Sequence, residues 1–347
     1  MSILLLCDIV LYNNFIRNSN NIVSKEQFSI VHITKIGMKL RCLENILNNI
    51  LDFFHTIYII TAINKEDNEQ YLKPFFENKS NVIHINIPQE NRKIIIKNCI
   101  LEDNLYISKY DEGMINNLVY NTQDKVYENI CSIINKIDIV IISDYAKGFL
   151  TDNLLFNTIG LCNKNNVITL INPTGSNYSK YMNGHIIKHN IKEATNFFGR
   201  NLYTEKDWYE YENKILNVLH IKCVLTTIGK DGMRISYKDA SNNIRHIQKN
   251  IIPYTIIDVT GCSDNIISAI AIYYIKNNKQ LNSYDNLLDI LTKICSKAVN
   301  YRGCYILNNQ NYNEIYNSSY DINKSVFIND LGRKNSINFE EKINILI

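Results

Sequence analysis

With 347 residues, the chain is long enough for one large domain with a small addition or for two domains. Its 37 Lys and Arg residues nearly balance 34 Asp and Glu residues, and no basic block stands out, so the charge indicates no nucleic-acid partner. No apolar run approaches the length that spans a bilayer. The apolar opening at 3–7 lacks the basic start and cleavage site of a signal peptide, and nine cysteines without a C-x-x-C pair argue against a zinc site or a disulfide framework and favour a cytoplasmic protein.

Apolar runs of strand length alternate with helical patterns along the chain. The predicted strands lie at 3–7, 56–61, 137–143, 167–171, 185–188 and 223–227. The predicted helices include 40–54, 124–135, 153–163, 191–198 and 206–219. This alternation predicts an α/β fold with a mostly parallel sheet that is covered by helices on both faces. Such sheets bind ligands at the carboxyl ends of their strands. Asp144, Asn172, Asn190 and Gly229 each follow a predicted strand, so we expect them to meet at one edge.

Two stretches, 13–36 and 82–111, do not fit the alternation, because they are strand-like and polar without a strong helical pattern. The end of the chain, 317–347, is rich in Ser, Asn and Lys and carries a short helical pattern at 339–347. The sequence therefore predicts one main domain over 1–316, followed by a tail.

The segment D-V-T-G-C-S-D at 258–264 is the most informative part of the chain. Its small residues predict a tight turn, and an apolar run with helical spacing follows at once. Backbone N–H groups of such a turn and of a helix N-terminus together bind anions such as phosphate. Asp264 would face that phosphate and could take a proton from an attacking hydroxyl. It could equally cap the helix that follows, and the local pattern leaves both interpretations open.

This segment resembles the D-x-T-G-A-G-D signature of the ribokinase-like (PfkB) carbohydrate kinases. S-D-Y-A-K-G at 143–148 resembles a stretch of bacterial heptose-7-phosphate kinases, the kinase half of a bifunctional enzyme that serves lipopolysaccharide synthesis. N-P-T-G at 172–175, N-I-K-E at 190–193 and T-I-G-K-D-G at 227–232 follow in the family's order. The resemblance implies a ribokinase-like fold. In it, the stretches 13–36 and 82–111 form a small β lid that closes over the sugar and often pairs two subunits into a homodimer.

The resemblance also implies ATP-dependent phosphoryl transfer to an alcohol group of a sugar or sugar phosphate. Asp264 would be the catalytic base, and the backbone of Gly261, Cys262 and Ser263 would form an anion hole. Glu193 would hold Mg²⁺ through water, since Mg²⁺ keeps many of its waters. The residues implied for nucleotide binding are Asn190, Glu193, Thr227, Gly229, Gly232 and Gly303. Two plainer interpretations stay open: Asn190 and Glu193 as a helix capping box, and the glycine segment as an ordinary turn after a strand.

The sugar-binding end departs from the family. G-M-K-L-R at 37–41 stands where the family has G-G-A-A-N, so that Met38 and Lys39 would crowd a sugar. Ser263 replaces a glycine of the signature, which adds strain if that position needs a positive φ. The resemblance assigns substrate binding to Asp8, Gly37, Arg41, Lys109, Asp144 and Lys147.

Two hypotheses of function follow. The preserved Asp264, Thr227 and Asn190 favour an active kinase. The altered segment 37–41 and Ser263 favour a non-catalytic relative that keeps the fold and a nucleotide site, or else a changed substrate. The lysines at the sugar-binding end could also be solvated surface residues.

Overall fold

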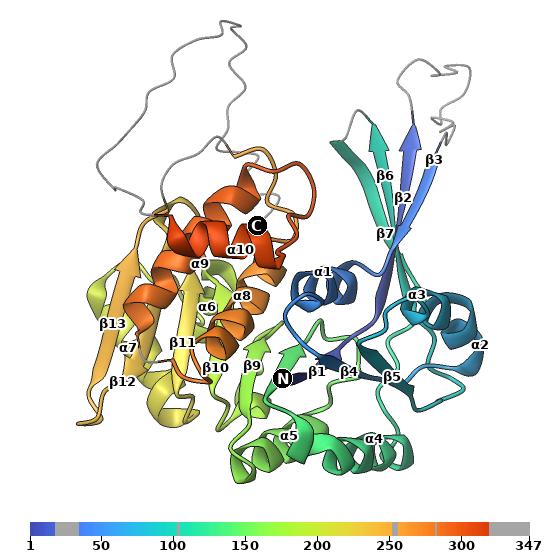
Figure 1. The fold of residues 1–347 in the computed structure, drawn as a ribbon, viewed down its shortest axis with the longest axis horizontal. Helices are drawn as coiled ribbons and strands as arrows, with labels where there is room; N and C mark the ends of the chain where they lie inside the picture. Colours follow the sequence, from blue (N-terminus) through green and yellow to red (C-terminus); the bar gives the residue numbers. More distant parts are fainter. Residues whose placement is uncertain (18–34, 103–104, 252–255, 282, 319–347) are drawn as a thin grey trace, which may run out of the picture.

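The computed structural model describes residues 1–17, 35–102, 105–251, 256–281 and 283–318, and a nine-stranded sheet forms its centre (Figure 1). In spatial order the strands are β13 (Ile244–Lys249), β12 (Met233–Lys238), β11 (Cys223–Thr227), β10 (Ile186–Asn190), β9 (Ile168–Asn172), β8 (Ile139–Ser143), β1 (Ser2–Cys7), β4 (Thr56–Thr61) and β5 (Val82–Asn86). The strands from β11 to β5 pair in parallel, and β12 and β13 add an antiparallel edge.

Helices cover both faces of this sheet. One face packs against α1 (Arg41–Ile50), α8 (Cys262–Lys276), α9 (Tyr284–Val299) and α10 (Asn309–Asn317). The other face packs against α4 (Tyr120–Ile133), α5 (Asp152–Lys164), α6 (Ile191–Phe198), α7 (Glu205–Asn213) and a π-helical turn at Lys214–Val218. In β1, Ile3 and Leu5 enter the first core, whereas Leu4 and Leu6 enter the second. Strands buried on both faces read as continuous apolar runs, which explains why the sequence shows them so clearly. Among the described residues, no helix is both long and apolar enough to cross a membrane.

A second sheet of four strands stands away from the first (Figure 1). Its order is β3 (Lys35–Lys39), β2 (Val10–Arg17), β6 (Ile95–Glu102) and β7 (Leu105–Glu112). Three short helical segments, α2 (Lys65–Asp67), Asn68–Leu72 and α3 (Lys73–Phe76), lie between β4 and β5 in the chain.

The strand-helix alternation predicted the large sheet and its helices correctly. All six predicted strands are present, and their bounds differ from the prediction by at most a few residues. One assignment was wrong: Val82–Asn86, placed with the lid, pairs with β4 and belongs to the main sheet. Residues 18–34 of the predicted lid and the helical pattern at 339–347 lie outside the described residues.

Gly232 joins the short 3-10 helix at Gly229–Asp231 to β12, and its backbone has φ +88°. A Cβ there would lie 1.9 Å from the carbonyl oxygen of Lys249 on β13. We therefore expect Gly232→Ala to lower the free energy of unfolding by about 2 kcal/mol or more, as measured by urea denaturation. Gly160→Ala is the matched control, because Gly160 lies in α5 and a Cβ added there would meet nothing within 4 Å. Equal stability of the two variants would contradict this role of Gly232.

Candidate active site

The N-terminus of α8 is built by a turn that a second loop holds in place. Asp258 accepts hydrogen bonds from the backbone N–H groups of Thr260 and Gly303, both at 2.9 Å. Gly261 has φ +79°, and a Cβ there would lie 3.2 Å from Sγ of Cys304. Gly303, predicted at the nucleotide site, is therefore fixed beside the turn through Asp258.

Asp264 lies in the first turn of α8 but does not cap it. The N-cap is Gly261, and no side chain caps this helix. The two oxygens of Asp264 instead accept hydrogen bonds from Nδ2 of Asn45 at 2.9 Å and from the hydroxyl of Tyr145 at 3.3 Å. Burial raises the pKa of Asp264 to about 6, against the hydrogen bond from Asn45 and the charge of Lys188, which lower it. A carboxylate with this pKa is suited to act as a base near neutral pH.

Backbone donors are available at the N-terminus of α8. Within the described residues, the N–H groups of Gly261, Ser263 and Asp264 have no hydrogen-bond acceptor, as is usual in the first turn of a helix. The N–H of Cys262 is directed to the carbonyl of Val259 at 3.3 Å. Of the three predicted anion-hole donors, Cys262 is thus already used by the turn, and the N–H of Asp264 is available in its place.

Lys188 was not predicted as a site residue, yet its side chain reaches the first turn of α8. It lies on β10 with 1% of its surface exposed, and its Nζ contacts Oγ of Ser263. Burial lowers the pKa of Lys188, opposed by the nearby negative charges of Glu193 and Asp264. The signal was present in the sequence: a lysine within an apolar parallel strand is buried on either face of the sheet and needs a reason to be there.

The predicted nucleotide residues gather at the carboxyl ends of β10 and β11. Asn190 ends β10 and pairs with Thr227 at the end of β11. Asn190 and Glu193 form a capping box for α6, with reciprocal hydrogen bonds of 2.8 and 2.9 Å. Gly229, with φ +56°, opens the turn that follows β11. The capping role is therefore confirmed, and the nucleotide and metal roles stay predictions.

Asp8 and Asp144 hold the loop that follows β8. Asp8 accepts from the backbone N–H groups of Tyr145, Lys147 and Phe149 at 3.0 to 3.1 Å. Asp144 accepts from the N–H of Ala146 at 2.7 Å and from the hydroxyl of Tyr181 at 2.6 Å. Each carboxylate is 1% exposed. These contacts favour a structural role for both residues, and their predicted binding of substrate remains untested.

Basic side chains gather where the small sheet meets the main domain. The guanidinium of Arg41 lies 4.9 Å from the ring centroid of Tyr12 on β2, and its charge lowers the pKa of Asp264. Asp111 on β7 pairs with Lys97 at 3.6 Å and with Lys147 at 3.5 Å. Lys109 lies two residues from Asp111, on the same face of β7, and Gly37 lies on β3 with open space around it. Arg41 thus acts on the carboxylate of Asp264, and Lys147 lies two residues after Tyr145, whose hydroxyl donates to that carboxylate.

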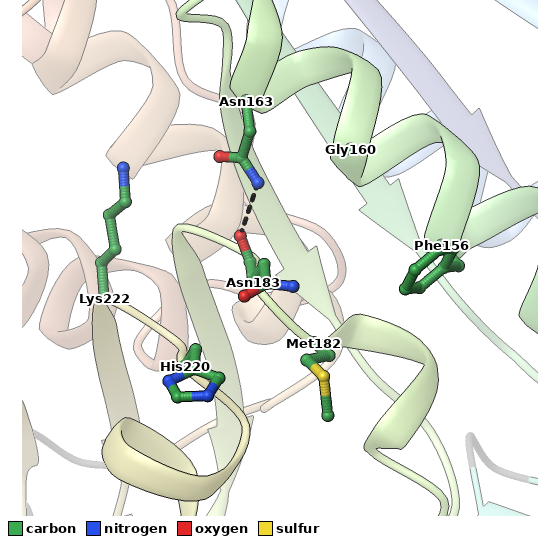
Figure 2. Close-up of a pocket in the computed structure, with 7 residues that line it drawn as sticks. All are labelled: Phe156, Gly160, Asn163, Met182, Asn183, His220 and Lys222. Carbon is green, nitrogen blue, oxygen red and sulfur yellow. Dashed lines mark hydrogen bonds between the residues drawn. The ribbon is translucent and has the colours of Figure 1, made fainter.

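A cavity of about 330 Å³ lies elsewhere (Figure 2). Phe156, Gly160 and Asn163 of α5 line one side. Met182, Asn183, His220 and Lys222 line the other. Met182 and Asn183 precede β10, and His220 and Lys222 precede β11, so the cavity is at the amino ends of these strands, whereas Asn190 and Thr227 lie at their carboxyl ends. It is therefore separate from the candidate active site.

Comparison with known proteins agrees with this geometry. Residues 96–284 match the model of the pfkB family carbohydrate kinases. The chain is 28% identical over 270 residues to the bifunctional protein HldE of Sulfurimonas denitrificans, covering 78% of this chain and 55% of that protein. It is 26% identical over 289 residues to the protein of the same name from Aliarcobacter butzleri, covering 82% and 59%. The chain thus spans little more than half the length of these curated relatives.

Solved structures share the fold. Phosphofructokinase-2 from Escherichia coli, in complex with substrates and products, is similar with a TM-score of 0.66 and 16% identity, over 91% of this chain and 98% of that one. Ribokinase from Arabidopsis thaliana, complexed with ribose and ATP, is similar with a TM-score of 0.67 and 13% identity, over 91% and 99%. The solved structures therefore share the fold. Because the family model matches more than half of its residues, the chain belongs to the pfkB family of carbohydrate kinases.

Proposed function

We propose that this protein transfers a phosphoryl group from ATP to an alcohol group of a sugar or sugar phosphate. The observation that carries the proposal is the buried carboxylate of Asp264, which has a pKa of about 6. It belongs to the first turn of α8, where the N–H groups of Ser263 and Asp264 have no acceptor among the described residues. Asp264 accepts the proton of the attacking hydroxyl. The N–H groups of Ser263 and Asp264 then stabilise the charge on the transferred group.

Glu193 fits the predicted role in holding Mg²⁺ through water. Its Oε2 is used by the capping box, and Oε1 has no hydrogen-bond partner within the described residues. Carboxylate oxygens are the ligands that Mg²⁺ prefers. When bound, Mg²⁺ would neutralise charge on the phosphates of ATP. Thr227, Gly229 and Gly303 would contact the nucleotide itself.

The acceptor we propose is a phosphorylated sugar, of the heptose 7-phosphate kind used in lipopolysaccharide synthesis in the cytoplasm. Arg41 supplies positive charge near Asp264, and Lys97, Lys109 and Lys147 lie on or against the small sheet, so this side of the site suits an anionic substrate. The bulky Met38 and Lys39 are both exposed on β3, so they restrict this side of the site less than the sequence suggested.

A panel of sugars and sugar phosphates, screened for acceptor-dependent ADP release, tests the proposal. We expect turnover with at least one phosphorylated sugar and weaker turnover with its uncharged counterpart. The alternative, a non-catalytic relative, rests on the altered segment 37–41, because Ser263 lies in α8 without a positive φ and adds no strain there. ATP binding without turnover of any acceptor would establish that alternative.

The rate should depend on pH through Asp264. Since only the ionised carboxylate accepts a proton, kcat/KM should be highest above pH 6 and fall as pH drops through the pKa of about 6. The hydrogen bond from Asn45 favours the ionised form, so Asn45→Leu should move this fall to higher pH by about one unit. A pH series of kcat/KM for both proteins measures this shift, and an unchanged profile would contradict the assignment.

We also propose pairing of two subunits through the small sheet. Met38, Ile107 and Tyr110 expose apolar surface on its strands, with exposed fractions of 57%, 49% and 53%. Light scattering of the purified protein should give the mass of a dimer, and a monomer at all concentrations would exclude the pairing.

A further inference from the structure

The side chain of Ser263 contacts Lys188, and the proposed transfer to a sugar gives the hydroxyl of Ser263 no role. Ser263 is the second residue of α8, and its side chain is exposed, whereas Lys188 is 1% exposed within β10. Nζ of Lys188 contacts Oγ of Ser263, and Oγ also lies 3.4 Å from Oδ1 of Asn172. One serine hydroxyl thus faces the solvent side of the anion site with a buried amine behind it.

The surroundings of Lys188 keep its amine available. Among the described residues its only hydrogen-bond partner is Ser263, and no carboxylate lies within the 4.0 Å of an ion pair. Burial lowers its pKa, which favours the neutral amine. A neutral amine can accept the proton of a neighbouring hydroxyl, and serine–lysine pairs of this kind supply activated nucleophiles in enzymes.

Ser263 also carries one of the backbone donors of the anion site. Its N–H and that of Asp264 have no acceptor within the described residues. A terminal phosphate of ATP that accepts these N–H groups would lie beside Oγ of the same residue. The hydroxyl of Ser263 would therefore lie next to the proposed phosphoryl group.

We propose that Ser263 is a site of self-phosphorylation, with Lys188 as its base and ATP as the phosphoryl donor. This inference uses the nucleotide site of the proposed function and adds a second acceptor to it. The O–H bond of Ser263 breaks, and its proton passes to Nζ of Lys188. Oγ forms a bond to the terminal phosphorus as the bond from that phosphorus to the bridging oxygen breaks, and ADP leaves. Phosphoserine, ADP and the protonated lysine account for all atoms and charges.

The modification would turn the protein off. A phosphate on Ser263 would occupy the donors that the terminal phosphate of ATP needs, and its negative charge would lie near Asp264. We therefore expect sugar-dependent ADP release to fall as the phosphorylated fraction rises. Added sugar should slow the modification, since it competes for the same phosphoryl group.

Mass spectrometry of the full-length protein tests the proposal after incubation with Mg²⁺ and ATP and without sugar. We expect the mass to rise by one phosphoryl group, with the phosphate mapped to Ser263. Ser263→Ala should abolish this mass increase. Ser132→Ala changes an exposed serine on α4 and should leave the mass increase unaltered. Lys188→Arg keeps a long basic side chain, but its guanidinium stays protonated and cannot act as a base, so it should slow the labelling by about 100-fold or more.

Asp264→Asn separates the two acceptors, because it should abolish transfer to sugar and retain phosphorylation of Ser263. Labelling of Lys188→Arg at the wild-type rate would overturn the role of Lys188. An unmodified Ser263 in a protein that phosphorylates a sugar would overturn this inference alone. A protein that neither binds ATP nor turns over any acceptor would overturn the proposed function as well.

Discussion

Asp264→Asn is expected to lower kcat for sugar phosphorylation by about 10²–10⁴-fold while leaving ATP affinity nearly unchanged. Asparagine has the size of the carboxylate and can keep a contact with Asn45, so the local structure should remain. It cannot accept the proton of the attacking hydroxyl. Acceptor-dependent ADP release gives kcat, and calorimetric titration gives the affinity for ATP.

Asp124→Asn is the matched control for this experiment, because Asp124 is exposed on α4. It should behave as the wild type in both assays. Full activity of Asp264→Asn would rule out Asp264 as the base, whereas loss of ATP binding as well would show that the substitution disturbs the anion site.

Lys188→Met is expected to lower kcat by about 10²–10³-fold, as the loss of one preorganised stabilising group does in other enzymes. The same change should leave the free energy of unfolding equal or raise it by about 1 kcal/mol, because it replaces a buried amine with an apolar side chain of similar length. Thermal unfolding and ADP release measure the two effects on the same preparation.

Lys164→Met provides the comparison, since Lys164 is exposed at the end of α5. It should change neither quantity. A large loss of stability in Lys188→Met without a loss of activity would show that Lys188 serves the fold and not the anion site.

The main sheet could be predicted because its strands are buried on both faces and read as apolar runs between helices. Val82–Asn86 was misplaced because it forms the edge of this sheet, where its residues are only partly buried and its pattern resembles that of the lid. The antiparallel strand β13 was not predicted for the same reason: its residues are half-buried or exposed.

The turn that carries Asp264 could be predicted because all its parts are local in the sequence. The partners of this turn could not. Lys188, Tyr145 and Asn45 reach Ser263 or Asp264 from 75, 119 and 219 residues away, and no pattern within one segment reports such contacts. Sequence also cannot distinguish a strand-end carboxylate that binds a ligand from one that binds its own loop, as the contacts of Asp8 and Asp144 show.

The most direct test of the account is a crystal structure with Mg²⁺ and a non-hydrolysable analogue of ATP. The account predicts that the terminal phosphate accepts hydrogen bonds from the backbone N–H groups of Ser263 and Asp264, with the carboxylate of Asp264 facing it across the space for a sugar hydroxyl. A nucleotide bound elsewhere, with this turn closed by protein side chains, would contradict it.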